Sequence, residues 1–392
     1  MKKKISFLTI IALLLAIVSG LVFKEQVTAV DFIGTIYINL LKFMIGPIVF
    51  TSIAETIYDS SKKRGKLIIK SVIIFTLMFL ATFFLTSIIV VLINPAKGFA
   101  FDLSSYEGAL GNLSIKEIII NLFPTNIISM FQTNQLFAII LFAYLVGFCA
   151  TKVEKGDVVI DVIKSFKNIL FKILEYIMYL TPLAVFSLMS NTVAKYGSIV
   201  FAVGVKYILT AYLAGFITMI VVMILPVWIF AKMNPIVFVK RIYKIWIITI
   251  TTCSSAATLP TTMRLCKEEL NIDREITDIV VPLGCTIHMC GGAVSFALLG
   301  LFCSSLFGIE VTLTTYIIMI VTSLLINMSA PGIPNGGVVI GATYLQLLGI
   351  PLDFIGFYSG IYKILDMLYT TLNVSGDITA NVIIDYLEKK EK

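Results

Sequence analysis

The sequence predicts an all-α polytopic membrane protein, and three observations carry that prediction. Of the 392 residues, 58% are apolar and 14% are charged, with a mean hydropathy of +0.99, whereas about a quarter of the residues in soluble domains are charged. Uncharged runs about as long as a bilayer is thick recur along the chain. The Lys and Arg residues behind the net charge of +7 lie in short clusters between these runs, which excludes the single basic face of a nucleic-acid-binding protein.

Five stretches have the length and composition of ordinary spanning helices, which need roughly 20 mainly apolar residues. They are residues 5–23, 32–54, 71–93, 176–194 and 207–231. The first follows three lysines and resembles a signal peptide. Its length and the lack of a small-x-small cleavage site favour a transmembrane helix instead.

Basic clusters predict the orientation of the chain. They occur near residues 62–66, 152–172, 232–244, 264–267 and 389–392. By the positive-inside rule this side is the cytoplasm, and the opposite loops are poorer in positive charge. We therefore expect a multi-pass protein of the plasma membrane with both termini in the cytoplasm.

Three stretches are too long or too polar for simple spans. Residues 118–151 contain an internal Pro-Thr-Asn and predict a broken spanning element. A polar, proline-containing centre predicts re-entrant hairpins over residues 233–262 and 311–350. Non-helical backbone at membrane depth is tolerated only where protein buries it or where it lines an aqueous cavity. Two such interruptions therefore indicate a binding site for a solute.

Four polar residues share one face of the last apolar helix. Asp366, Thr370, Asn373 and Asp377 follow one another at intervals of four, three and four residues. A carboxylate at the bilayer centre costs about 3 kcal/mol and so marks a functional site by default. The alternative is a stripe of interhelical hydrogen bonds, which neutral side chains supply at lower cost.

Motifs in a fixed order from end to end give the chain a family resemblance. They are Gly46-Pro47 within residues 40–50, Pro124-Thr125-Asn126, Ser254-Ser255-Ala256-Ala257-Thr258-Leu259-Pro260, Pro282-Leu283-Gly284-Cys285-Thr286-Ile287, Gly332-Ile333-Pro334 and Asn373-Val374-Ser375-Gly376-Asp377. The chain resembles the dicarboxylate/amino acid:cation symporter family, the prokaryotic glutamate transporter homologues.

The resemblance implies an architecture. Members have eight transmembrane helices plus two re-entrant helical hairpins, arranged as inverted repeats in a homotrimer that works as an elevator. The implied layout is a single membrane domain over residues 1–392. Its scaffold part would be residues 1–66 and 116–198, and its transport part residues 67–115 and 199–392.

The resemblance also implies a function, the import of a small amino acid or dicarboxylate by cation-coupled symport. The implied partners are that solute, a monovalent cation and the lipid bilayer, with no cofactor and no nucleic acid. The substrate-binding residues would be Ser254, Ser255, Gly292, Ile333, Gly337, Asp366, Tyr369, Thr370 and Asn373. The cation-binding residues would be Gly284, Thr286, His288, Asn327, Met328, Ala330, Asn373 and Asp377, with sodium at Asp377.

Departures from the family pattern narrow the substrate and the ion. Tyr369 stands where carriers of acidic substrates have an Arg that binds a side-chain carboxylate. We therefore expect a small neutral amino acid, although Lys363 leaves a dicarboxylate open. His288-Met289-Cys290-Gly291-Gly292 replaces Asn-Met-Asp-Gly-Thr, and Met78-Phe79 replaces Thr-Ser, which argues against a third sodium site.

Several alternatives remain open at this stage. His288, the only histidine, could carry a proton or could be a hydrogen-bonded core residue. Lys363 could pair with Asp366 or extend to the membrane interface. Cys285, His288 and Cys290 suit a transition metal, but their spacing matches no standard zinc pattern. The chain could also be a sensor that binds without transport. An enzyme is disfavoured because no nucleophile, base and orienting group converge in the sequence.

Overall fold

The computed structural model describes residues 2–61, 65–98, 120, 123–132, 135–197, 199–327 and 336–391. Within these ranges the chain forms helices and no strands, in agreement with the all-α prediction. Three helical stretches are long and apolar enough to span a membrane, Lys66–Ile93, Ala202–Ala231 and Arg274–Leu306. A bent pair, Gly156–Met178 with Thr181–Lys195, would make a fourth. The count of eight spans and two hairpins stays a prediction.

The first group of helices packs around α2. The group consists of α1 (Lys2–Phe23), the 3₁₀ helix η1 (Lys24–Val30), α2 (Asp31–Ser61), α5 (Ile127–Gln132), α6 (Leu136–Ala150), α7 (Gly156–Met178) and α8 (Thr181–Tyr196). Helix α2 contacts α6, α7 and α8, and α1 lies along α8. Helices α5 and α6 are separate, which agrees with the broken element expected over residues 118–151.

The span expected over residues 176–194 differs from the structure. Helix α7 ends at Met178, α8 begins at Thr181, and the two are bent by 53°. Pro182 occupies the first turn of α8. Since proline has no N–H and clashes with the preceding turn, α7 cannot continue through it.

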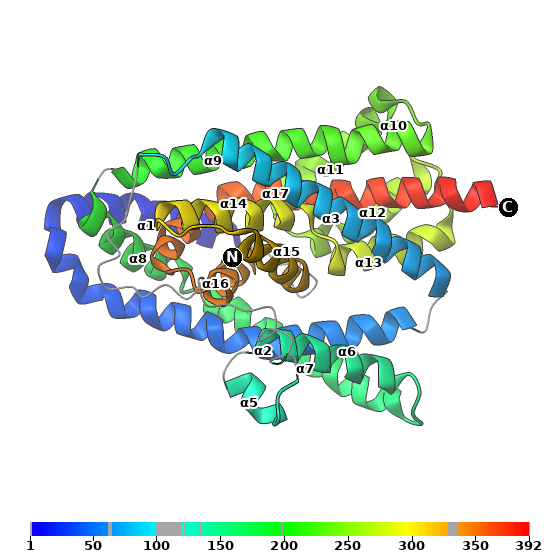
Figure 1. Ribbon diagram of the computed structural model, residues 1–392, viewed down its shortest axis with the longest axis horizontal. Helices are drawn as coiled ribbons and strands as arrows, with labels where there is room; N and C mark the ends of the chain where they lie inside the picture. Colours follow the sequence, from blue (N-terminus) through cyan, green and yellow to red (C-terminus); the bar gives the residue numbers. More distant parts are fainter. Residues whose placement is uncertain are drawn as a thin grey trace.

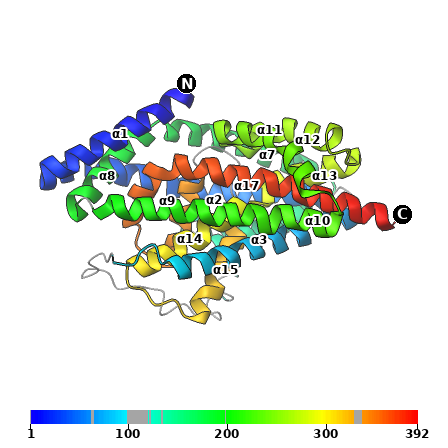
Figure 2. The ribbon, with the colours of Figure 1, turned by 90° about the horizontal axis from the view of Figure 1, so that it is seen from above.

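The remaining helices form a second group. It consists of α3 (Gly65–Ile93), α9 (Ile199–Thr218), a π-helical segment η3 (Met219–Ile224), α10 (Leu225–Ala231), α13 (Arg274–Ile287), α14 (Cys290–Leu306) and α17 (Asp353–Glu391). Helix α17 runs unbroken through the middle of this group and contacts α9, α13 and α14. Figure 2 shows it running lengthwise beside α9 to the C-terminus.

Two helix pairs occupy the positions of the expected hairpins. The first pair is α11 (Pro235–Thr252) and α12 (Ser255–Glu268), so its second helix extends beyond residue 262. Cys253 has a left-handed φ of 48°, and Ser254 caps α12. The second pair is α15 (Leu313–Asn327) and α16 (Gly336–Leu347). The residues between them, 328–335, lie outside the described ranges.

Buried apolar side chains divide between the two groups of helices. One cluster is built from residues 37–184 of α2 and α5 to α8, with Leu347 packed against it. The largest cluster contains residues of α3, of α9 and of the helices from α13 through α17. It also includes Ala16 of α1 and Met189 and Val193 of α8. A third lies among α10 to α13 and α17. Figure 1 shows α2, α5, α6 and α7 on one side of the bundle and α3, α9, α11 and α17 on the other.

The turn after α6, the turn after α10 and the C-terminal end of α17 lie at one end of the bundle, on the right in Figure 1, and all three carry basic residues. They are Lys152 and Lys155 after α6, Lys232 after α10, and Lys389 with Lys390 in α17. Lys70 of α3 forms ion pairs with Glu388 and Glu391 at this end, at 2.6 and 2.7 Å. Several of the basic clusters that the sequence assigns to one side of the membrane therefore lie in segments at one end of the described structure.

Candidate functional site

A cavity lies where α14 and α17 meet the ends of the two helix pairs. Its volume is about 50 Å³. Seven predicted substrate residues line it: Ser255, Gly292, Gly337, Asp366, Tyr369, Thr370 and Asn373. Residues that are distant in the sequence thus converge on one small space.

Asp366 is the one charged residue among those described that line this cavity. Its carboxylate oxygen Oδ1 accepts a hydrogen bond from Thr370 Oγ1 at 3.2 Å. Residues 328–335, between the helices of the second pair, contain no Lys, Arg or His. Lys363 does not line the cavity, but its side chain approaches the thiol of Cys253, which does. The cavity therefore suits a solute with an amino group.

An aromatic wall closes the cavity beside Asp366. The rings of Tyr362 and Tyr369 lie 6.3 Å apart, centroid to centroid. The Tyr369 hydroxyl comes close to Ser295 but makes no hydrogen bond of good geometry with any described residue. Ser295 Oγ bonds instead to Tyr358 Oη at 2.7 Å. Among the described residues this wall therefore consists of neutral hydroxyl groups and aromatic rings and contains no guanidinium.

Helix α14 starts directly against the backbone of α17. The N–H of Gly291 donates to Asn373 Oδ1 at 2.8 Å. A Cβ on Gly291 would lie 2.2 Å from the carbonyl oxygen of Tyr369, so only glycine permits this approach. The Asn327 amide fits Met289 when its nitrogen donates to the Met289 carbonyl and its oxygen accepts from the N–H, both at 3.3 Å. The non-helical segment between α13 and α14 is therefore held from two sides.

His288 lies in that segment and faces Asp377. Its Nδ1 is 2.9 Å from Asp377 Oδ1, and its Nε2 is 3.1 Å from Cys290 Sγ. The ring stacks on Phe75 at 4.5 Å, with 12° between the planes. A nucleophile, a base and an orienting group do converge here, contrary to the reading of the sequence. All three are almost completely buried, at 0%, 1% and 2% exposure for Cys290, His288 and Asp377, and none lines the cavity, so no substrate reaches the thiol.

The other predicted residues have different placements. Ser254 does not line the cavity, and its Oγ accepts from Ala257 N at 3.2 Å as the cap of α12. Gly284 packs against Asp377, since a Cβ there would lie 2.4 Å from Oδ1. Met328, Ala330 and Ile333 lie outside the described ranges. Among the described residues no group of three or more His, Cys, Asp or Glu side chains is placed to hold a metal ion.

Six lining residues were missed from the sequence. They are Cys253, Met289, Ser295, Phe296, Ile340 and Tyr362. Tyr362 lies one turn before Asp366 on the polar face of α17, so extending the stripe by four residues would have found it. Ser295 and Phe296 similarly lie one turn after Gly292.

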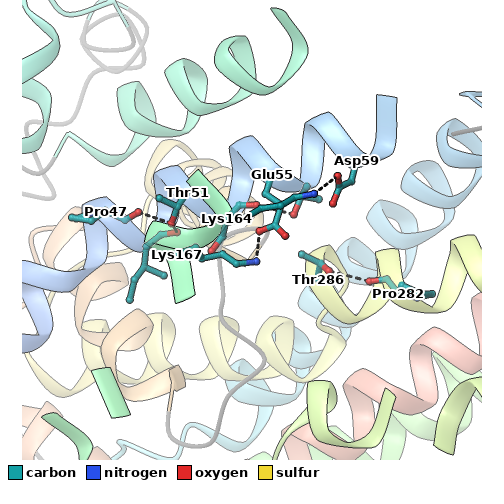
Figure 3. Close-up of polar contacts among 11 residues, drawn as sticks. Pro47, Thr51, Glu55, Asp59, Lys164, Lys167, Pro282 and Thr286 are labelled. Carbon is teal, nitrogen blue, oxygen red and sulfur yellow. Dashed lines mark hydrogen bonds and ion pairs between the residues drawn. The ribbon is translucent and has the colours of Figure 1, made fainter. Parts of the chain in front are cut away.

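A second cavity, of about 150 Å³, separates α2 and α7 from α3 and α13. Its lining residues are Glu55, Thr56, Asp59, Ile68, Lys167, Ile279, Pro282, Leu283 and Thr286. Figure 3 shows Lys167 paired with Glu55, and Lys164 with Asp59 at 2.9 Å. Thr286, a predicted cation residue, faces this space, and its Oγ1 donates to the Pro282 carbonyl at 2.9 Å. One wall carries paired charges and the opposite wall none.

Comparison with known proteins agrees with the resemblance seen in the sequence. A profile of the sodium:dicarboxylate symporter family matches residues 5–387. The chain is 27% identical to a proton/glutamate-aspartate symporter of Bacillus subtilis, over 99% of this chain and 96% of that protein. It is 27% identical to a proton/sodium-glutamate symport protein of Geobacillus stearothermophilus, over 97% and 95%. It is 24% identical to a C4-dicarboxylate transport protein of Laribacter hongkongensis, over 97% and 89%.

Proposed function

This chain belongs to the sodium:dicarboxylate symporter family, and from that premise we propose that it imports a small neutral amino acid with a coupling cation. The family consists of transporters, so the chain is a membrane transporter and not an enzyme. Relatives are named for proton or sodium coupling and for glutamate, aspartate or C4-dicarboxylates. The cavity at Asp366 carries the proposal of a different substrate here.

The electrostatics of that cavity support a substrate with one amino and one carboxylate group. Asp366 pairs with the amine. Helix α12 begins at Ser255, and the backbone N–H groups of its first turn form a positive helix end. This end can bind the carboxylate of the amino acid's backbone. A second carboxylate would be buried beside Tyr362, Tyr369 and Phe296, where the described lining residues offer no positively charged partner, which costs several kcal/mol.

We further propose that the two groups of helices move as separate bodies. The separate apolar core of α2 and α5 to α8 and the polar cavity between α2 and α13 support a scaffold and an elevator-like transport part. The end that gathers the basic residues would face the cytoplasm by the positive-inside rule. Assembly as a homotrimer in the plasma membrane completes the proposal.

Binding tests the substrate assignment without requiring transport. Purified protein is titrated with neutral amino acids, acidic amino acids and dicarboxylates, and the midpoint of thermal unfolding reports binding. We expect a neutral amino acid to raise the midpoint. Asp366→Asn should weaken that binding about ten- to hundredfold, because it removes a charge-assisted hydrogen bond of about 1.5–3 kcal/mol.

The matched control is Asp161→Asn, which makes the same change at an exposed position of α7. It should bind as the wild type does. If a dicarboxylate without an amine bound tightly, or if Asp366→Asn bound the amino acid normally, Asp366 would not be the amine ligand and the proposed substrate class would be wrong.

A further inference from the structure

We propose that the imidazole of His288 permanently fills the cation-binding position beside Asp377, so that this site works without sodium. The proposal rests on the proposed function, since it concerns how a cation-coupled carrier of this family is coupled. The resemblance assigns sodium to Asp377 together with backbone carbonyls at Gly284, His288 and Asn373. The described atoms around the carboxylate fit an imidazole instead.

Asp377 Oδ1 has an imidazole nitrogen as a close neighbour. His288 Nδ1 lies 2.9 Å from this oxygen, which is hydrogen-bonding distance. With Asp377 as a carboxylate the ring nitrogen donates, because a carboxylate only accepts. A hard cation needs oxygen ligands at about 2.3–2.6 Å, and the N–H of the ring already fills that space. A nitrogen that carries hydrogen has no lone pair to offer an ion.

The ring is also fixed in place. Phe75 stacks on one face at 4.5 Å, and Cys290 Sγ contacts Nε2 at 3.1 Å. A Cβ on Gly376 would lie 2.6 Å from His288 Cε1, so the backbone of α17 closes off the edge of the ring. With an exposure of 1%, the imidazole cannot swing away into water to admit an ion.

The backbone of α13 approaches the same oxygen from the other side. A Cβ on Gly284 would lie 2.4 Å from Asp377 Oδ1 and 3.1 Å from the Phe75 ring. Glycine at position 284 therefore allows the carboxylate to sit directly on the helix. The imidazole and this glycine both contact Oδ1, and the Phe75 ring packs against both of them. The imidazole thus replaces a bound ion in two respects. It is a hydrogen-bond partner for the buried carboxylate, and it links the end of α13 to α17.

Thermal unfolding in sodium or potassium chloride at equal ionic strength tests the proposal. In the wild type, Asp377→Asn should leave any difference in midpoint between the two salts unchanged, because sodium held elsewhere would not use this carboxylate. His288→Asn restores the side chain of the family motif and removes the ring, so it should show a sodium-specific rise of a few degrees. Adding Asp377→Asn to that variant should abolish the rise, whereas adding Asp161→Asn should not.

If His288→Asn does not fold, the wild type and its Asp377→Asn variant still test the proposal. A sodium-specific rise in the wild type that Asp377→Asn removes would show that sodium binds with the ring present. A folded His288→Asn protein with no sodium effect would equally contradict the role of the ring as the occupant.

The single histidine allows a second readout. In protein labelled with ¹⁵N-histidine and reconstituted in lipid, all imidazole signals belong to His288. Exchanging potassium for sodium should leave both ring nitrogen signals unchanged, and Asp377→Asn should shift Nδ1. A sodium-dependent shift in the wild type would contradict the proposal. Neither measurement uses uptake, so a failure of the proposed transport function would be seen separately.

Discussion

Asp366 and Tyr369 lie three residues apart on α17, and both line the cavity assigned to the substrate. One supplies a negative charge and the other a buried, neutral hydroxyl. The selectivity of the cavity therefore depends on a difference between two neighbouring side chains. Only a group that carries a proton or a positive charge can be paired beside Asp366.

Replacing Tyr369 should move that selectivity. Tyr369→Arg adds a guanidinium that can bind a carboxylate with two hydrogen bonds, so we expect binding of acidic amino acids to appear and binding of neutral ones to weaken at least tenfold. Competition against a labelled neutral amino acid measures both. Tyr369→Phe is the control, because it removes only the hydroxyl and should keep the neutral preference. Unchanged selectivity in Tyr369→Arg would mean that this side chain does not face the substrate.

At the same scale the sequence predicted much of the cavity, but not the environment of each residue. The intervals between Asp366, Thr370, Asn373 and Asp377 were enough to place them on one helical face. That His288 points at Asp377 was not visible, because residues 89 positions apart meet only through tertiary packing. The capping role of Ser254 was missed for a related reason: in the sequence its neighbour Ser255 looks equivalent.

At the scale of elements, the join between α13, α14 and α17 organises the site. Helix α13 ends at Ile287, and α14 begins at Cys290 after two non-helical residues, of which His288 is extended. The segment brings the His288 ring to Asp377 and the Met289 backbone to the Asn327 amide. A polar, proline-containing centre indicated each of the two helix pairs from the sequence, whereas this shorter break was identified only through the resemblance. The bend at Pro182 was missed because the hydropathy of residues 176–194 is uniform enough for a straight span.

Gly291 should be intolerant of even one added methyl group. Its Cβ would meet the Tyr369 backbone at 2.2 to 2.6 Å, and backbone cannot rotate away. We expect Gly291→Ala to lower the free energy of unfolding by about 1–3 kcal/mol, measured by thermal or denaturant unfolding. Gly46→Ala in α2 is the matched control, since its nearest neighbour is the Phe131 side chain at 3.3 Å. A stability of Gly291→Ala equal to that of the control would contradict the close approach.

At the scale of the whole molecule, the proposed division into two bodies follows the burial of apolar side chains more closely than it follows the order of the chain. Helix α3 lies between α2 and α5 in the sequence but packs on α14. Composition could not reveal that α3 packs with the second group of helices, because α2 and α3 are both long apolar helices. The partition at residues 66 and 116 came from the resemblance and stays a prediction.

A cross-link between the two bodies tests that partition. A Cβ on Gly356 of α17 would lie 2.7 Å from Leu188 Cβ of α8, within about 1 Å of the spacing in a disulfide. We expect Leu188→Cys with Gly356→Cys to lose uptake on oxidation and to regain it on reduction. Each single cysteine variant serves as a control and should not respond to oxidant. Full uptake by the oxidised, cross-linked protein would rule out relative movement at this contact.

Gradient-driven uptake into proteoliposomes tests the central claim most directly. Labelled neutral amino acids, acidic amino acids and dicarboxylates are offered under an inward sodium gradient or an inward proton gradient, with counterflow measured in parallel. The account predicts accumulation of a neutral amino acid under at least one gradient, its loss when the gradient is dissipated, and its loss in Asp366→Asn. Saturable binding without accumulation or counterflow would contradict it and would identify the protein as a sensor that kept the fold without transport.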